Sequence, residues 1–134
     1  MKTLTVDTNA VLRYLTNDIP LQANKVKTYL IKAQKGQISL ELTLIVIVEI
    51  MFQLQHWYEV SKEKAANSLI TFISPDWIKV KNKSAVLEAI KLYKSKNIDL
   101  VDLLLWSTAT AEEQQILSFD KDFDKLEPSI RLKP

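Results

Sequence analysis

The sequence predicts an α/β domain in which helices cover both faces of a central parallel sheet of four to five strands, a three-layer α/β/α architecture. Short β-branched or apolar runs alternate with segments whose apolar residues recur at helical spacing. Strands that are joined by helical crossovers pair in parallel. The chain is 134 residues long. Because a domain takes roughly 150 residues on average, this length indicates a single domain over residues 1–134.

Turn and capping residues delimit the elements of the first third of the chain. Asp7 follows a β-branched run and precedes the apolar residues of a first helix, as a capping residue does. Pro20 is typical of a first helical turn, and Gly36 is typical of a helix end. The predicted elements are, in order, a strand over 3–6, a helix after Asp7, a helix from Pro20 to about Gln34 and a strand over 37–40.

The most apolar segment, residues 42–54, fits two structures. Its β-branched run over 45–48 favours a strand by propensity. The whole segment, however, is longer than a typical strand of about 5–6 residues, and Thr43 can cap a helix. We therefore expect a buried helix. The segment is well short of the roughly 20 residues of a membrane span and contains Glu49, so it does not predict a transmembrane helix.

Helices and strands continue to alternate in the rest of the chain. Ser61 and Asp99 stand where a helix N-cap is expected, and Pro75 stands just beyond a helix end. The predicted elements are a helix from Ser61 to about Ser74, a strand over 77–80, a helix over 84–96, a helix from Asp99 to about Glu113, a strand over 116–119, a short helix after Asp120 and a final strand near 130–132.

The composition excludes several chemistries. There are no cysteines, which rules out disulfides, thiol nucleophiles and cysteine metal sites. The single histidine, His56, rules out a multi-histidine site, and the single glycine, Gly36, rules out a glycine-rich phosphate loop. The formal charge of +2 does not by itself indicate a nucleic-acid partner. The pattern contains neither a signal peptide nor a membrane span, so we expect a cytoplasmic protein.

Carboxylates, hydroxyls, amides and lysines are the side chains left to carry a reaction, and the carboxylates form the clearest pattern. Asp7 and Asp120 each follow a predicted strand, and open parallel sheets bind ligands at the carboxyl ends of their strands. Glu49 lies in an apolar segment, where a carboxylate is unfavourable unless it is paired or bound to a cation. Asp99 and Asp102 open a helix. Each acid also fits a structural role, as a helix cap or on an exposed helix face. Together, carboxylates without cysteine suit Mg²⁺ or Mn²⁺.

Four segments of the chain resemble the PIN domain family, and in particular its VapC-type toxin branch. They lie in the family's order along essentially the whole chain, and the first and last are the most specific. The four segments are VDTNAVLRYL over 6–15, IVEI over 47–50, DLVDLLL over 99–105 and LSFDKDF over 117–123. Two residues depart from the family's pattern, because Leu103 stands where alanine is frequent and Ser118 where threonine is frequent. Neither departure removes a carboxylate.

The resemblance implies a metal-dependent ribonuclease. It makes Asp7, Glu49, Asp102 and Asp120 an acidic quartet that holds Mg²⁺ or Mn²⁺ and serves catalysis. The residues that the resemblance places in support of this quartet are Thr8, Asn9, Asp99 and Ser118. VapC-type proteins are toxins of type II toxin–antitoxin pairs, are usually homodimers and are held inactive by a cognate antitoxin. The implied partners are therefore an RNA substrate, an antitoxin protein and a second copy of the chain, and no membrane.

Two other functions stay open on the sequence alone. One is a PIN-like binding module without catalysis, and the other is a stand-alone RNA-processing nuclease without an antitoxin. A calcium loop beginning at Asp120 is excluded, because Lys125 and Arg131 occupy the positions of its glycine and its last glutamate. The residues do not distinguish transfer, ribosomal or messenger RNA as the target, nor one bound metal ion from two.

Apolar side chains in the helices predicted over 43–56 and 61–73 exceed what one small core needs. Because large exposed apolar patches mark partner sites, we expect a homodimer with an antitoxin groove in this region. The residues concerned are Ile50, Met51, Leu54, Trp57, Tyr58, Ala65, Leu69 and Phe72. We expect the three tryptophans, Trp57, Trp77 and Trp106, to lie in the core or in an interface rather than to stack on bases.

Overall fold

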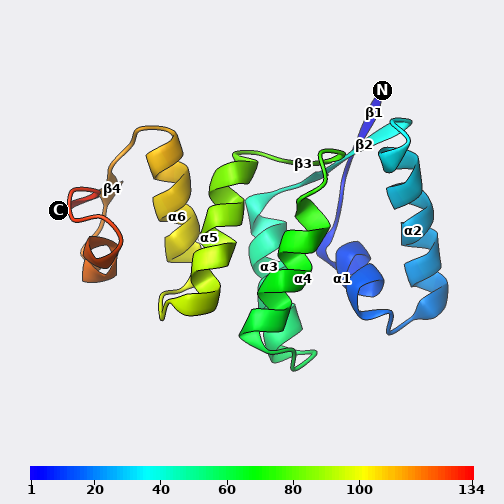
Figure 1. Cartoon of the computed structure of the whole chain (residues 1–134), viewed down its shortest axis with the longest axis horizontal. Helices are drawn as coiled ribbons and strands as arrows, with labels where there is room; N and C mark the ends of the chain where they lie inside the picture. Colours follow the sequence, from blue (N-terminus) through cyan, green and yellow to red (C-terminus); the bar gives the residue numbers. More distant parts are fainter. The chain divides into compact units, whose positions relative to one another are not determined.

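A computed structural model describes all residues from 1 to 134, and these residues form two compact units. The first unit comprises Met1–Lys81 and the second comprises Asn82–Pro134. The colours in Figure 1 follow both units along the chain. No helix in either unit is long and apolar enough to cross a bilayer.

A parallel sheet organises the first unit. Its three strands are β1 (Lys2–Thr5), β2 (Ile38–Leu42) and β3 (Ile78–Val80), paired in the order β1-β2-β3. Leu4 lies opposite Leu40, and Leu40 lies opposite Ile78, so these side chains form one row across the sheet. Leu40 and Ile78 are almost completely buried. The sheet therefore contributes a continuous apolar row to the core.

Four helices accompany this sheet: α1 (Thr8–Thr16), α2 (Pro20–Gln34), α3 (Leu44–His56) and α4 (Lys62–Ile73). Helix α1 packs against α2 and α3, and α3 packs against α4. Figure 1 shows α3 and α4 side by side. Every helix and strand predicted for this part of the chain is present, with its ends shifted by a few residues, as is usual at element boundaries.

The ambiguous apolar segment is a helix, as predicted. Thr43 supplies the N-cap, because its Oγ1 accepts a hydrogen bond from the backbone N–H of Val46 at 3.4 Å. Ser61 caps α4 in the same way, accepting from the N–H of Lys64 at 3.2 Å. The β-branched run was outweighed because one face of α3, including Ile47 and Ile50, is completely buried.

The predicted excess of apolar surface on α3 and α4 is wrong for most of the residues that suggested it. Six of the eight are buried in the structure: Ile50, Met51, Leu54, Ala65, Leu69 and Phe72. They are buried because α3 packs against α1 and α4, which gives each of these helices two apolar contact sides. Tyr58 is half-buried, and Trp57 is 78% exposed. An interface argument based on the six buried residues therefore fails.

A polar cluster joins the end of α1 to the loops beside it. The Arg13 guanidinium donates to Asp18 Oδ2 at 3.1 Å, to the Tyr58 hydroxyl at 3.0 Å and to Gln22 Oε1 at 3.0 Å. The Tyr58 hydroxyl donates to Asp18 Oδ2 at 2.9 Å, and the Thr16 hydroxyl donates to Asp18 Oδ1 at 3.0 Å. Asp18 thus connects α1, the start of α2 and the segment between α3 and α4.

The second unit contains two helices and a small sheet. Helix α5 (Lys83–Ser95) packs against α6 (Leu100–Ala111), and the parallel strands β4 (Ile116–Leu117) and β5 (Arg131–Leu132) follow, with the 3-10 helix η1 (Lys121–Lys125) between them. Arg131 donates through Nε and Nη2 to the two carboxylate oxygens of Asp124, both at 2.9 Å. This two-point ion pair connects η1 to β5.

The prediction of one sheet of four to five strands is wrong. The structure has a three-stranded sheet and a separate two-stranded sheet, because β4 pairs only with β5. The N–H groups of Ile116 and Ser118 donate to the carbonyls of Ile130 and Leu132 at 2.8 and 3.0 Å. Strand–helix alternation predicts that strands pair in parallel, but it does not determine which strands share a sheet.

Left-handed backbone conformations close several helices and turns. Gly36 has φ of 76° after α2, where the predicted helix end lies. Four other residues adopt positive φ without being glycine: Asn17, Glu59, Asn82 and Glu113. Asn17 ends α1, and its N–H donates to the carbonyl of Arg13 at 3.0 Å.

The Asp18 cluster predicts a specific dependence of stability on pH. Desolvation raises the pKa of Asp18, but hydrogen bonds from Tyr58 and Thr16 and the charge of Arg13 outweigh it, so the net pKa lies below its ordinary value. The stability that this contributes is present above the unfolded-state pKa of about 3.9 and is lost as the pH falls through the lower folded-state pKa. We expect Asp18→Asn to flatten the decline of the unfolding free energy below about pH 4.

Urea unfolding at a series of pH values measures this effect. Asp76→Asn is the matched control, because it removes an exposed carboxylate of the same unit outside the cluster. Parallel pH profiles for the wild type and Asp18→Asn would contradict the predicted linkage.

Candidate functional site

Asp7 lies at the end of β1 and at the N-cap position of α1. Its carbonyl accepts from the N–H of Ala10 at 3.1 Å, but its side chain makes no capping hydrogen bond. The carboxylate is exposed and borders an apolar pocket of about 220 Å³ in the first unit. The Asp7 side chain therefore does not cap α1, although the sequence allows that role, and its oxygens make no hydrogen bond to the start of the helix.

Thr8 and Glu49 are brought together in the first unit. The Thr8 hydroxyl donates to Glu49 Oε2 at 3.1 Å, and Thr8 is only 3% exposed. Glu49 is itself exposed on α3, so one oxygen contacts a buried donor while the carboxylate stays open to water. Asn9 is exposed on the first turn of α1. The sequence-predicted residues of this unit thus lie at the start of α1 and on α3.

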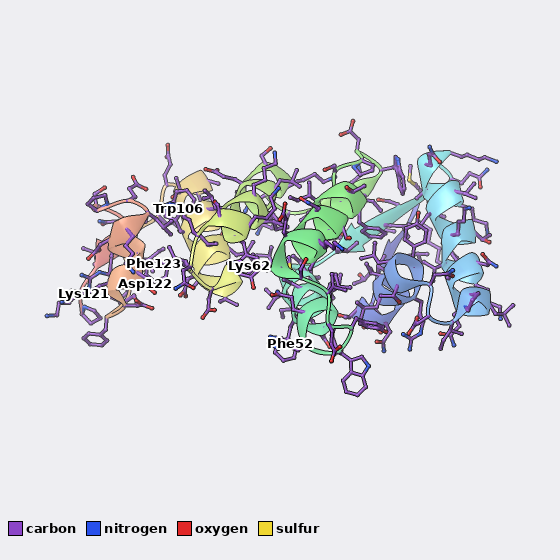
Figure 2. The ribbon with its side chains drawn as sticks, turned by 60° about the horizontal axis from the view of Figure 1, so that its bottom comes forward. Phe52, Lys62, Trp106, Lys121, Asp122 and Phe123 are labelled. Carbon is purple, nitrogen blue, oxygen red and sulfur yellow. The ribbon has the colours of Figure 1, made fainter.

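Three carboxylates gather in the second unit. Asp102 lies in the first turn of α6, Asp120 lies at the N-cap position of η1, and Asp122 lies in its first turn. One oxygen from each lies within 4.8 Å of the others. Figure 2 shows Asp122 beside Phe123, whose side chain is buried and anchors the segment.

Short-range hydrogen bonds define the backbone of this acidic segment. The N–H of Asp120 donates to Ser118 Oγ at 2.9 Å, and the N–H of Asp122 donates to Asp120 Oδ1 at 2.8 Å. The Asp120 side chain therefore caps η1, which is the structural role that the sequence also allows for this residue. Lys125 Nζ contacts Asp122 Oδ1 at 3.0 Å. Part of the negative charge of the cluster is thus balanced within η1.

Neighbouring charges act on Asp102. Desolvation, followed by the negative charges of Asp120, Asp99 and Asp122, raises the pKa of Asp102 above its ordinary value. Asp99 lies at the N-cap position of α6 but makes no side-chain capping bond. A set of carboxylates whose charges disfavour the ionisation of Asp102, with no sulfur or imidazole ligand among them, fits a hard divalent cation such as Mg²⁺ that binds oxygen ligands.

Asp122 is the residue of this cluster that sequence reasoning missed. It follows Asp120 by two residues but is not among the ligands that the family resemblance implies. A 3-10 turn that begins at Asp120 brings the two carboxylates together. The expectation that Asp7 and Asp120 follow strands of one sheet is wrong. Asp7 follows β1 of the three-stranded sheet, whereas Asp120 follows β4 of the two-stranded sheet. The reason is again the separate pairing of β4 with β5.

Comparisons with known proteins give a family match. A model of the PIN domain family matches residues 4–127. No curated protein matches the chain. Among solved structures, the chain is similar to the crystal structure of VapBC2 from Rickettsia felis bound to a DNA fragment from their promoter, with 18% sequence identity, coverage of 98% of each chain and a TM-score of 0.40.

Asp102→Asn tests whether the carboxylates of the second unit form a cation site. Without divalent cations, we expect this variant to raise the melting temperature near neutral pH, because it removes a charge that its neighbours repel. Mg²⁺ or Mn²⁺ is expected to raise the melting temperature of the wild type, and to do so much less in the variant, because a ligand of the native state stabilises it.

Thermal unfolding with and without the cation provides the measurement, with NaCl at matched ionic strength to separate binding from screening. Glu88→Gln, an exposed acid on α5, is the control variant. Equal cation-induced shifts in the wild type and Asp102→Asn would exclude Asp102 as a ligand.

Proposed function

Because the chain belongs to the PIN domain family, we propose that it is a metal-dependent endoribonuclease and the toxin of a VapC-type toxin–antitoxin pair. The family match covers residues 4–127, so it includes most of both compact units. It also confirms the predicted α/β/α fold class, apart from the number of strands in the main sheet. The VapC branch is supported by the four resembling segments of the sequence.

One observation carries the nuclease proposal: the approach of Asp102, Asp120 and Asp122 to within 4.8 Å of one another. In a member of this family, such a group supports a site for Mg²⁺ or Mn²⁺. We propose that the ligands come from Asp7, Glu49, Asp102 and Asp120, as the resemblance implies. When bound, such a cation orients a water molecule and neutralises charge on the phosphodiester that is cleaved.

The other residues of the site are proposed to position these carboxylates. The buried Thr8 hydroxyl holds one oxygen of Glu49, which limits the rotamers of that side chain. Ser118 holds the backbone of Asp120, and Asp120 in turn holds that of Asp122. Asp99 adds negative charge near Asp102. Positions fixed in this way support cation binding without a large rearrangement.

We further propose two protein partners. An antitoxin would inactivate the nuclease by placing an arginine or lysine side chain against the carboxylates, where its charge replaces that of the cation. A second copy of the chain would form a homodimer. The dimer proposal now rests on the family resemblance alone, because the apolar residues expected to form its interface are mostly buried within the first unit.

Asp7→Asn and Asp120→Asn test the catalytic proposal separately in the two units. Each is expected to reduce RNA cleavage by about 100-fold or more, because several kcal/mol of charge stabilisation depends on the cation. Both variants should remain folded, since neither carboxylate is buried. Cleavage of total RNA with Mg²⁺ or Mn²⁺, followed by mapping of the cut sites, measures the loss.

Asp76→Asn serves as the control for loss of an exposed carboxylate. Full cleavage by both site variants would refute the proposed ligands. A fold that binds the cation but cleaves no RNA would instead favour the non-catalytic binding module.

Co-expression tests the partners. We expect the chain to co-purify with the product of a small reading frame adjacent to its gene, and we expect the complex to cleave RNA much more slowly than the free chain. Sedimentation of the free chain should give about twice the monomer mass of 15.4 kDa. Cleavage that persists in the complex would favour the stand-alone nuclease, and a clean monomer would refute the dimer.

A further inference from the structure

The short segment that carries Asp120 and Asp122 is held at both ends by one side chain. Arg131 donates from Nε and Nη2 to the two carboxylate oxygens of Asp124, both at 2.9 Å. Its Nη1 donates to the carbonyl oxygen of Ser118 at 3.2 Å. Ser118 lies just before the two acids in the sequence, and Asp124 lies just after them. One guanidinium group therefore closes this segment into a ring.

Ser118 connects Arg131 to both acids. Its N–H donates to the carbonyl of Leu132 at 3.0 Å, and its own carbonyl accepts from Arg131. Its Oγ accepts from the N–H of Asp120 at 2.9 Å. Asp120 Oδ1 in turn accepts from the N–H of Asp122 at 2.8 Å. A continuous set of hydrogen bonds therefore runs from the guanidinium group to the backbone of the two carboxylates.

The chemistry and the burial of Arg131 suit it to hold a backbone segment. A guanidinium group is planar and presents its donors in a fixed geometry, which a flexible lysine cannot reproduce. The Arg131 side chain is only 13% exposed, so water competes little for its donors. The hydrogen bond between the two side chains raises the pKa of Arg131 and lowers the pKa of Asp124. Both groups therefore stay charged at neutral pH.

The ion pair between Arg131 and Asp124 lies outside the segments that resemble the PIN domain family. The last of those segments ends at residue 123, and the match to the family model ends at residue 127. Asp124 lies beyond the first of these limits, and Arg131 lies beyond both. The family assignment therefore gives this pair no role, and any role must be inferred from its contacts.

We propose that Arg131 is a positioning residue, which holds Asp120 and Asp122 in the places where one cation can contact both. This inference rests on the proposed nuclease function and names a residue that this function needs besides its ligands. Arg131 does not itself contact the cation; it acts through Asp124 and Ser118. Side chains that orient the ligands of a metal typically change the metal affinity by 10–100-fold when they are removed.

The charge of Arg131 gives the proposal a test by sign. The negative charge of Asp120 contributes to the raised pKa of Arg131, so the guanidinium group lies near a proposed ligand. A positive charge at this place repels a cation. Loss of the charge alone would therefore strengthen cation binding, whereas loss of positioning weakens it.

Binding of Mn²⁺ to the full chain, followed by the electron paramagnetic resonance of the free ion, measures this effect. We expect Arg131→Gln to raise the Kd for Mn²⁺ about tenfold, although it removes a positive charge. Arg131→Lys keeps the charge but loses the fixed donor geometry, so it should weaken binding by a similar factor. Circular dichroism at the temperature of the titration verifies that each variant is folded, so that lost stability is not counted as lost affinity.

Amide hydrogen exchange measures the positioning without any cation. In EDTA, we expect the N–H groups of Asp120 and Asp122 to exchange about tenfold faster in Arg131→Gln, because a segment released at both ends opens more readily. The N–H of Ile116 donates to the carbonyl of Ile130 at 2.8 Å and lies outside the segment. Its exchange should stay unchanged, which shows that β4 and β5 remain paired.

Two control variants separate positioning from charge and from general destabilisation. Lys133→Gln removes an exposed positive charge two residues beyond Arg131. Gln115→Ala removes a hydrogen bond to the carbonyl of Ser129 at 3.0 Å, which joins the chain before β4 to the chain before β5 without contacting the acidic segment. Each control should leave the Kd for Mn²⁺ within about twofold of the wild type.

The outcomes distinguish this inference from the proposed function. Unchanged Mn²⁺ affinity in Arg131→Gln would overturn the positioning role, even if the wild type binds Mn²⁺ and cleaves RNA. Tighter binding in Arg131→Gln, with wild-type affinity in Arg131→Lys, would leave only a charge effect and reject the role as well. Faster exchange confined to Asp120 and Asp122, in a chain that binds no Mn²⁺, would uphold the positioning of the two acids and reject the proposed nuclease site.

Discussion

The hydroxyl of Thr8 lies where water hardly reaches, and it donates its hydrogen bond to Glu49. A buried hydroxyl without a partner costs about 1–3 kcal/mol, so this contact fixes the start of α1 against α3. Because Asp7 immediately precedes Thr8, the same contact determines where the end of β1 and its carboxylate lie. The first unit thus couples the packing of two helices to the placement of its exposed acids.

The second unit brings its acids together by a different principle. No buried donor holds Asp102 in place; it lies in the first turn of α6, and a 3-10 turn carries Asp120 and Asp122 to it. Desolvation and, after it, the negative charges of the neighbouring acids raise the pKa of Asp102, and Lys125 balances only part of that negative charge. The fold therefore tolerates an unfavourable charge arrangement here, as expected where function rather than stability determines the residues.

The helices and strands were largely predictable because their signals are local. Thr43 and Ser61 cap helices as their patterns indicate, and Gly36 ends one. Which strands pair with one another depends on contacts between residues far apart in the sequence. The local signals therefore do not show that β4 and β5 form a sheet of their own. Asp122 was missed because its approach to Asp102 depends on a tertiary contact, and the burial of Met51 and Leu69 depends on how α3 packs against its neighbours. Exposure of Trp57 could not be deduced for the same reason.

The four left-handed residues other than glycine have a consequence for how the chain tolerates change. Each conformation costs on the order of 1 kcal/mol in the native state, less for asparagine, which adopts it more readily. A glycine there would remove this strain but would widen the ensemble of the unfolded chain by a similar free energy. The two effects are of similar size and opposite sign. Replacement of a left-handed residue by glycine should therefore change the free energy of unfolding little at any of the four positions, Asn17, Glu59, Asn82 and Glu113. A chain with a single glycine can therefore keep its tight turns, because its stiffer unfolded state offsets the strain in its folded one.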